Sequence, residues 1–263
     1  MSAEGDLREV GELRVSLLQL PSKDGDVEAN LELLRTILKT VKADLYLTPE
    51  MFLTGFEPVE GNFSINGIWS KVRELSEGKV LGVGGPLEED GRLYNAYLVF
   101  NDKRLVHIRK KKILFKAMRE HETFSIGNDP SVFELKGFKF SIFICYEVRF
   151  PELFYKPFQE GVEVLVIPAA WPESRVMAWK ALVKARAIEN LAYSIGINRW
   201  GNGKYGPFGG HSSITKPTGE SVELGDGIGF LTYSISKEEV LSSRKFPSYE
   251  DRIELMTKAN ILP

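Results

Sequence analysis

Residues 139–152 read KFSIFICYEVRFPE, and this stretch decides how the rest of the chain is organised. Aromatic and β-branched residues dominate its first half, a composition typical of a buried strand. Its second half ends in Pro151 and Glu152, and a proline followed by an acidic residue favours the first turn of a helix. The pattern therefore predicts that Cys145 lies where a strand gives way to a helix.

Cys145 is the only cysteine in the 263 residues, so the sequence offers no partner for a disulfide. A sharp strand-to-helix turn lifts a side chain out of the sheet beside free backbone N–H groups, which suits a nucleophile. A buried structural cysteine is the alternative, because cysteine is among the most buried residue types. This stretch alone leaves both interpretations open.

The composition is that of an ordinary globular protein, with 43% hydrophobic and 27% charged residues. A net charge of −2 gives no basic field for nucleic acid or acidic lipid, so neither partner is expected. We expect no membrane span, because no apolar run approaches about 20 residues. The N-terminus is polar and a lone cysteine favours a reducing compartment, so a cytoplasmic location is predicted.

The order of the predicted elements indicates an α/β fold. A strand at 13–20, a helix at 27–42 and a strand at 44–48 favour a parallel pair with a crossover helix. Further strands are predicted at 80–84, 93–100, 104–109, 132–135, 138–144, 164–168, 192–197, 212–215 and 229–233, with hairpins that make the sheet arrangement mixed. Further helices are predicted at 68–76, 151–161 and 175–191, and Ser236 with Glu239 predicts a capping box that opens a short last helix.

Two segments lack a clear pattern. Residues 198–210 are rich in glycine and are predicted to form a loop. The tail from about residue 246 is predicted to pack on a partner subunit, because it has too little pattern to pack by itself. Without a linker, repeat or break in composition, we expect residues 1–263 to form a single domain.

Metal and phosphate sites are not predicted. The glycines lack the spacing of a dinucleotide or phosphate loop. The three histidines, His107, His121 and His211, are isolated in the sequence and match no zinc spacing. We therefore expect no metal and no cofactor.

Three chemically useful groups each follow a predicted strand: Glu50, the lysines at 110–112, and Cys145. If the strand ends converge, a lysine would favour the thiolate and help hold an oxyanion, while Glu50 would transfer protons. A Cys–His arrangement using His121 or His211 is the alternative. Solvated charges are the simplest interpretation of Glu50 and of each single lysine.

Seven ordered segments of the chain resemble the nitrilase superfamily of carbon–nitrogen hydrolases. They are 48–56 (TPEMFLTGF), 109–115 (RKKKILF), 144–153 (ICYEVRFPEL), 170–172 (AWP), 184–190 (KARAIEN), 198–199 (NR) and 210–212 (GHS). The resemblance implies a four-layer α-β-β-α sandwich with mixed sheets, and a homodimer or larger assembly. It also implies that Glu50, Lys111 and Cys145 form a catalytic triad supported by Glu120.

Two departures from the family pattern stand near these residues. Ile113 replaces a usual histidine, and Glu147 stands where many relatives have aspartate, which we expect to be a mild change. Lys111 is chosen among three lysines by counting back from Leu114 and Phe115. Because side chains alternate along a strand, Lys111 is also expected to face away from its two neighbours.

The predicted activity is hydrolysis of a small amide through a Cys145 thioester, with the N–H near Tyr146 helping to bind the oxyanion. The motif wording is closest to the ω-amidase-like branch. Trp171 is expected to be a wall of the site, and Arg149 or Arg175 either binds a substrate carboxylate or forms a structural ion pair. A nitrile or N-carbamoyl hydrolase, a Cys–His protease and a silent scaffold on this fold are the rival predictions.

Overall fold

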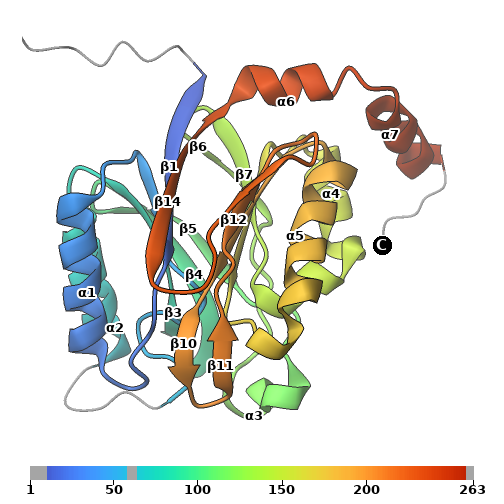
Figure 1. Ribbon diagram of the computed structural model, residues 1–263. Helices are drawn as coiled ribbons and strands as arrows, with labels where there is room; N and C mark the ends of the chain where they lie inside the picture. Colours follow the sequence, from blue (N-terminus) through green and yellow to red (C-terminus); the bar gives the residue numbers. More distant parts are fainter. Residues whose placement is uncertain (1–10, 58–63, 259–263) are drawn as a thin grey trace, which may run out of the picture.

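The computed structural model describes residues 11–57 and 64–258. Twelve strands of the described residues form two six-stranded mixed sheets that pack face to face. Helices cover both outer faces, with α1 and α2 on one side and α4 and α5 on the other (Figure 1). The α-β-β-α order of layers agrees with the fold that the sequence resemblance implied.

The first sheet has the strand order β14-β1-β2-β3-β4-β5, in which β1, β2 and β3 run parallel and the other neighbours antiparallel. Helices α1 and α2 are the crossovers between its parallel strands. The elements are β1 (Glu12–Gln19), α1 (Val27–Thr40), β2 (Leu45–Leu47), α2 (Ile65–Leu75), β3 (Val80–Glu89), β4 (Arg92–Asn101), β5 (Arg104–Lys110) and β14 (Gly229–Ser236).

The second sheet has the order β13-β12-β9-β8-β7-β6, in which β7, β8 and β9 run parallel. Its strands are β6 (Val132–Leu135), β7 (Phe138–Ile142), β8 (Val164–Ala169), β9 (Tyr193–Asn198), β12 (Ser213–Thr215) and β13 (Ser221–Glu223). The helices on it are α4 (Tyr155–Gln159) and α5 (Val176–Asn190). The short 3-10 helices η2 (Cys145–Arg149) and η3 (Pro151–Phe154) join β7 to α4.

Helix α1 shows how local sequence selects these elements. Asp26 caps it by accepting the N–H of Ala29 at 3.0 Å. Leu31, Leu34 and Leu38 recur at helical spacing and are buried against the first sheet. Burial of each such side chain contributes about 2 kcal/mol.

The core between the sheets is apolar and draws on both of them. Val15 and Leu17 of β1 belong to the same buried cluster as Phe140 and Ile142 of β7. Successive side chains of a strand alternate between its two faces, so each sheet supplies one apolar face to this core. The core fixes the spacing of the two sheets, and with it the spacing of the strand ends that carry the site.

Several local predictions differ from the structure. Residues 198–210 contain a small hairpin, β10 (Trp200–Gly203) with β11 (Gly206–Gly209). Strand β13, which was not predicted, pairs with β12. The predicted capping box is wrong: Ser236 makes no side-chain cap bond to α6 (Lys237–Ser243), and Glu239 instead contacts Tyr193 and Lys216.

The tail forms a helix, α7 (Ser248–Lys258), which the sequence pattern did not predict. The ring of Tyr249 packs on Phe158 of α4, and the guanidinium of Arg252 lies 4.2 Å from the same ring. Apolar content in α7 is low, and only Met256 in it is buried, so a hydrophobic pattern gave no signal. Within the described residues, none of the helices has the length and apolar content to cross a lipid bilayer.

Candidate active site

Side chains from both sheets meet at one edge of the sandwich. Glu50 follows β2 and Lys111 follows β5 in the first sheet, whereas Cys145 follows β7 in the second. A further short segment after β5 holds η1 (Lys116–Met118) and α3 (Glu120–Thr123). The predicted convergence of these strand ends is therefore observed.

Cys145 has a strained backbone. Its φ of 52° lies in the left-handed region, which costs a residue with a Cβ on the order of 1–3 kcal/mol. The strain arises because the chain leaves β7 and enters η2 within two residues. Such a turn holds the thiol at a fixed position at the edge of the sheet, and only 6% of the residue is exposed.

Lys111 is buried between two carboxylates. Its Nζ donates to Glu50 Oε1 at 2.7 Å and to Glu120 Oε1 at 2.8 Å. Asn95 of β4 also donates to Glu50 Oε1, at 2.8 Å, and the N–H of Ala170 donates to Glu50 Oε2 at 3.0 Å. Every one of these contacts is buried, so the positions of the charged atoms are fixed by several partners each.

Glu120 supports this arrangement from the segment after β5. Its Oε1 accepts a hydrogen bond from Lys111 Nζ, and its Oε2 accepts one from the N–H of Phe115 at 2.8 Å. The residue before it, Arg119, is itself left-handed with a φ of 57° and ends η1. A tight turn therefore directs the Glu120 side chain inward.

The electrostatics of the cluster favour a protonated lysine beside a neutral thiol. Burial raises the pKa of the Cys145 thiol and Glu50 raises it further, against the opposing effect of Lys111. Burial alone would lower the pKa of Lys111, but the charges of Glu50 and Glu120 outweigh it and raise that pKa. Burial likewise raises the pKa of Glu120, because desolvation outweighs the attraction of Lys111.

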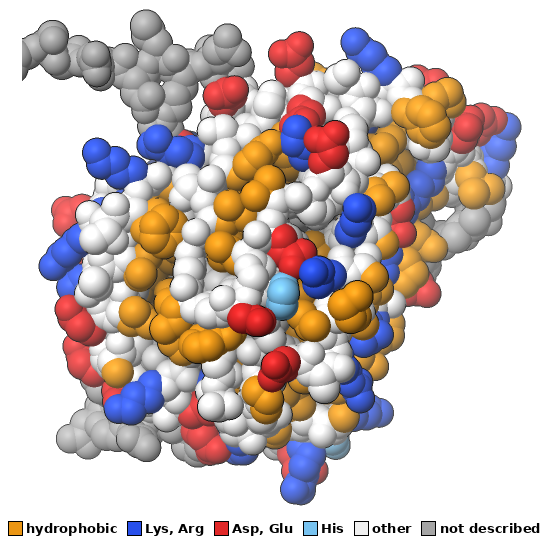
Figure 2. Space-filling view, viewed as in Figure 1, with side chains coloured by type: hydrophobic (Ala, Val, Ile, Leu, Met, Phe, Trp, Pro, Cys, Tyr) orange, Lys and Arg blue, Asp and Glu red, His pale blue; other side chains and the backbone are white. Residues whose placement is uncertain are grey.

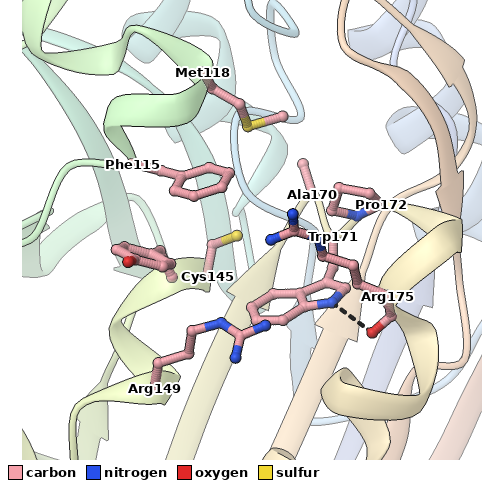
Figure 3. Close-up of a pocket in the computed structure, with 9 residues that line it drawn as sticks. Phe115, Met118, Cys145, Arg149, Ala170, Trp171, Pro172 and Arg175 are labelled. Carbon is pink, nitrogen blue, oxygen red and sulfur yellow. Dashed lines mark hydrogen bonds between the residues drawn. The ribbon is translucent and has the colours of Figure 1, made fainter.

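The thiol faces a small cavity whose lining residues are drawn in Figure 3. Apolar and cationic side chains line it together: Phe115, Met118, Cys145, Tyr146, Arg149, Ala170, Trp171, Pro172 and Arg175. The predicted contact residues Tyr146, Arg149, Trp171 and Arg175 are thus all brought to one cavity.

The two arginines are held in different ways. The guanidinium of Arg149 lies 4.8 Å from the Trp171 ring, a cation–π contact. Arg175 accepts the Trp171 indole N–H with its backbone oxygen at 2.9 Å, which leaves its guanidinium free to reach over the cavity (Figure 3). Within residues 11–57 and 64–258, neither guanidinium forms an ion pair with a carboxylate.

Other predicted candidates lie elsewhere. Lys110 pairs with Glu89 at 2.5 Å and with Asp129 at 3.4 Å, away from the cavity. His211 contacts Glu223, and neither it nor His121 is among the residues that line the cavity. Among the described residues, no group of three or more His, Cys, Asp or Glu side chains is arranged to hold a metal ion.

Sequence reasoning missed Asn95 and the cavity walls Phe115, Met118 and Pro172. Asn95 had a usable signal, because it is an amide within the otherwise apolar strand 93–100 and is completely buried. Phe115 and Pro172 lie in the matched segments 109–115 and 170–172, but nothing in the sequence marks them or Met118 as cavity walls, since apolar side chains in loops look alike in a core and in a cavity.

Comparison with known proteins agrees with this geometry. The family model for carbon–nitrogen hydrolases matches residues 14–244. The chain is 30% identical to 2-oxoglutaramate amidase of Bacillus subtilis over 249 residues, which cover 90% of this chain and 96% of the relative. It is 28% identical to omega-amidase YafV of Escherichia coli K12, over 92% and 97% of the two chains.

Solved structures show the same fold. The protein XC1258 from Xanthomonas campestris, a CN-hydrolase superfamily protein with an arsenic adduct in its active site, superposes with a TM-score of 0.82. It is 26% identical, over 91% of this chain and 97% of that one. Nit3 of Saccharomyces cerevisiae, a member of branch 10 of the nitrilase superfamily, gives a TM-score of 0.77 at 26% identity, over 89% and 94% of the two chains.

Proposed function

The chain belongs to the carbon–nitrogen hydrolase family, and from that premise we propose that it hydrolyses the terminal amide of a small linear acid through a thioester on Cys145. Amidase-type hydrolysis is the activity shared with its named relatives. The observation that carries the proposal is the buried contact of Lys111 with both Glu50 and Glu120, beside the only cysteine of the chain.

In the first half of the proposed reaction, Glu50 takes the thiol proton as Cys145 Sγ attacks the amide carbonyl carbon. Lys111 and the backbone N–H of Tyr146 bind the developing oxyanion. The C–N bond breaks when Glu50 returns the proton to the leaving nitrogen, which departs as ammonia. The raised pKa of Cys145 supports a role for a base, because the free thiol is neutral near pH 7.

In the second half, Glu50 takes a proton from water as the water oxygen attacks the thioester carbon. The C–S bond breaks, the thiol regains a proton and the carboxylic acid is released. Glu120 holds the ammonium of Lys111 in place throughout, since its Oε1 accepts from Lys111 while its Oε2 accepts the N–H of Phe115. No step needs a metal or a cofactor.

For the substrate we propose an ω-amide whose far end carries a carboxylate. Arg149 and Arg175 line the cavity without a carboxylate partner among the described residues, so their charges are available to an anion. The ω-amidase and 2-oxoglutaramate amidase relatives carry names of the same chemistry. Nitrile and N-carbamoyl hydrolysis are the alternatives within the superfamily.

The experiment is ammonia release over a panel of amides, nitriles and N-carbamoyl compounds, each offered with a free carboxylate and as its neutral methyl ester. We expect the acid-terminated amides to have the highest kcat/KM. Arg149→Met and Arg175→Met should each lower kcat/KM for the acid by at least about tenfold and leave the ester nearly unchanged. If these variants lose kcat/KM equally on the acid and on the ester, the proposal that the arginines bind a substrate carboxylate is wrong.

Cys145→Ala tests the nucleophile. We expect no measurable turnover and an unchanged unfolding temperature, because a small side chain at a strand end leaves little cavity. Wild-type protein incubated with substrate should gain the mass of the acyl group at Cys145. An adduct on another residue would overturn the assignment, and a protein inactive on the whole panel would favour the scaffold alternative.

We also propose a homodimer and a reducing, cytoplasmic location. Helix α5 exposes Met177 and Ile188 on one face, and Ile188 lines a groove together with the exposed Phe246 at the start of the tail. An apolar face of this kind suits a second copy of the chain. Light scattering that shows a stable monomer would contradict the dimer.

A reactive thiol is best preserved in a reducing compartment, which supports the proposed location.

A further inference from the structure

Glu147 is buried between the two segments that carry Lys111 and Cys145, and it does not line the cavity. Its Oε2 accepts the N–H of Ile144, the residue before Cys145, at 2.8 Å. Its Oε1 accepts the N–H of Lys112, the residue after Lys111, at 2.5 Å, and that of Ile113 at 3.3 Å. One carboxylate thus joins the backbones beside both residues.

Arg109 also joins these two segments. Its Nη2 donates to Glu147 Oε2 at 3.0 Å, and its Nε donates to the backbone oxygen of Ile142 at 2.9 Å. Arg109 stands in β5 and Ile142 is the last residue of β7, so the guanidinium spans the two sheets. With 2% of Arg109 and none of Glu147 exposed, each charge needs the other as its counterion.

The position of this ion pair matters because β5 ends at Lys110. Lys111 still donates its N–H to Asn95 of β4, but the next two N–H groups have left the sheet. Glu147 supplies the acceptors that the sheet no longer offers. Buried N–H groups need such acceptors, so the path of the chain after Lys111 depends on where Glu147 lies.

We propose that Glu147, with Arg109 as its counterion, is a positioning residue that holds the Lys111 segment in register with the Cys145 turn. It acts through the backbone and touches neither substrate nor reacting atoms. The extra methylene of glutamate is used in this chain, because aspartate would withdraw the oxygens by about 1.5 Å. We therefore expect the change at residue 147 to matter more than the motif comparison suggested.

This inference rests on the proposed function, and the experiment separates the two. Glu147→Gln leaves one acceptor oxygen, so it can serve only one of the two segments. Glu163→Gln is the matched control, since Glu163 is also buried, accepts a backbone N–H from Lys139 at 2.9 Å and pairs with Lys237 at 3.4 Å. It stands at the start of β8, at the opposite end of that strand from Ala170.

For Glu147→Gln we expect kcat on the best amide to fall at least about tenfold while KM changes less than about threefold. The rate of Cys145 alkylation by iodoacetamide should fall as well, and its pH dependence should move to higher pH, because Lys111 no longer favours the thiolate. Glu163→Gln should keep kcat within about twofold of wild type and leave the alkylation profile unchanged.

A kcat for folded Glu147→Gln within about threefold of wild type would overturn the inference. If that variant does not fold, Glu147→Asp, which keeps the charge opposite Arg109, is measured against the same thresholds. If neither folds where Glu163→Gln does, Glu147 serves the fold and the inference is wrong. A wild-type protein without amide turnover would instead fail the proposed function, while the alkylation profiles would still test Glu147.

Discussion

Two clusters of charged side chains have almost the same contact distances and opposite surroundings. In the buried cluster, Lys111 lies 2.7 Å from Glu50 and 2.8 Å from Glu120, with 0–1% of each side chain exposed. In the exposed cluster, Lys180 lies 2.8 Å from Glu223, with 37% and 27% of the side chains exposed. Figure 2 shows the face of the molecule where a histidine lies among such acidic and basic side chains.

Contact distance alone does not determine how much free energy an ion pair contributes, because exposure of the pair to water has the larger effect. An exposed pair is screened and contributes about 0–1 kcal/mol. Loss of one partner from a buried pair leaves an uncompensated charge and costs about 3–5 kcal/mol. The buried cluster can therefore shift pKa values and stabilise a transition state, while the exposed cluster can do neither to a comparable extent.

The largest effect is expected from the buried ammonium. Lys111→Ala should lower kcat at least about a hundredfold, because it removes the charge beside the thiol and the oxyanion. Lys110→Ala and Lys112→Ala, the adjacent controls, should each cost less than about tenfold. Steady-state kinetics of the three variants decides the matter. If Lys110→Ala or Lys112→Ala is the inactive one, the assignment is wrong by one residue, and if none is inactive the proposed mechanism fails.

A smaller but still strong effect is expected for the second carboxylate. Glu120→Gln should lower kcat by about tenfold or more while the protein stays folded, because the amide keeps the shape and loses the charge that holds Lys111. Circular dichroism on the same sample checks the fold. Full activity of this variant would show that the contact between Glu120 and Lys111 does not contribute to catalysis.

His107 extends the comparison to a buried group that, within the described part of the chain, forms no ion pair, although Asp129 exerts a small opposing effect on its pKa. Burial and then Arg109 lower its pKa to about 4, whereas the unfolded chain takes up this proton near pH 6.5. The unfolded state therefore binds more protons between these values, and stability should fall as pH drops from 6.5 to 4.

His107→Phe keeps the ring that stacks on Phe133 at 4.1 Å and removes the titration. Unfolding temperatures between pH 7 and pH 4 should decline less steeply in this variant than in wild type. Turnover at pH 7.5 should be unchanged, because His107 does not line the cavity. Parallel declines in the two proteins would show that His107 does not set the acid sensitivity.

The smallest effects are expected from the exposed cluster. Lys180→Ala and His211→Ala should change kcat less than about twofold. A Cys–His protease mechanism predicts the opposite for His211→Ala, namely complete loss of activity. Thermal unfolding of both variants within about 2 °C of wild type would complete the contrast with the buried cluster.

Much of the fold was predictable because its strands and long helices are strongly patterned. The apolar runs around Val15 and Phe140 and the helical spacing of Leu31, Leu34 and Leu38 gave their elements directly. Short elements such as β13 and the β10–β11 hairpin are held by pairing to neighbours, which leaves little trace in local sequence. Helix α7 was missed because aromatic and cationic contacts of Tyr249 and Arg252 hold it.

At the site, the predictable residues were charged or reactive side chains that directly follow buried strands. Glu50, Lys111 and Cys145 each follow a strand end, and the ordered motifs selected them. The contacts of Asn95 with Glu50 and of Arg109 with Glu147 join segments more than 30 residues apart. No local pattern encodes that approach, so these pairings emerge only from the packed sheets, although the amide in an apolar strand marks Asn95 itself as unusual.

The buried cluster has a consequence for how a turnover ends. Two carboxylates and one ammonium, Glu50, Glu120 and Lys111, give it a net charge of −1 when all three are ionised. The amide group of the substrate is neutral and is not repelled by this cluster, whereas the carboxylate formed from it lies beside like charges. Under the proposed mechanism the cluster therefore favours release of the product, while Arg149 and Arg175 would hold the far carboxylate of substrate and product alike. We expect the acid to compete only weakly with the next substrate molecule.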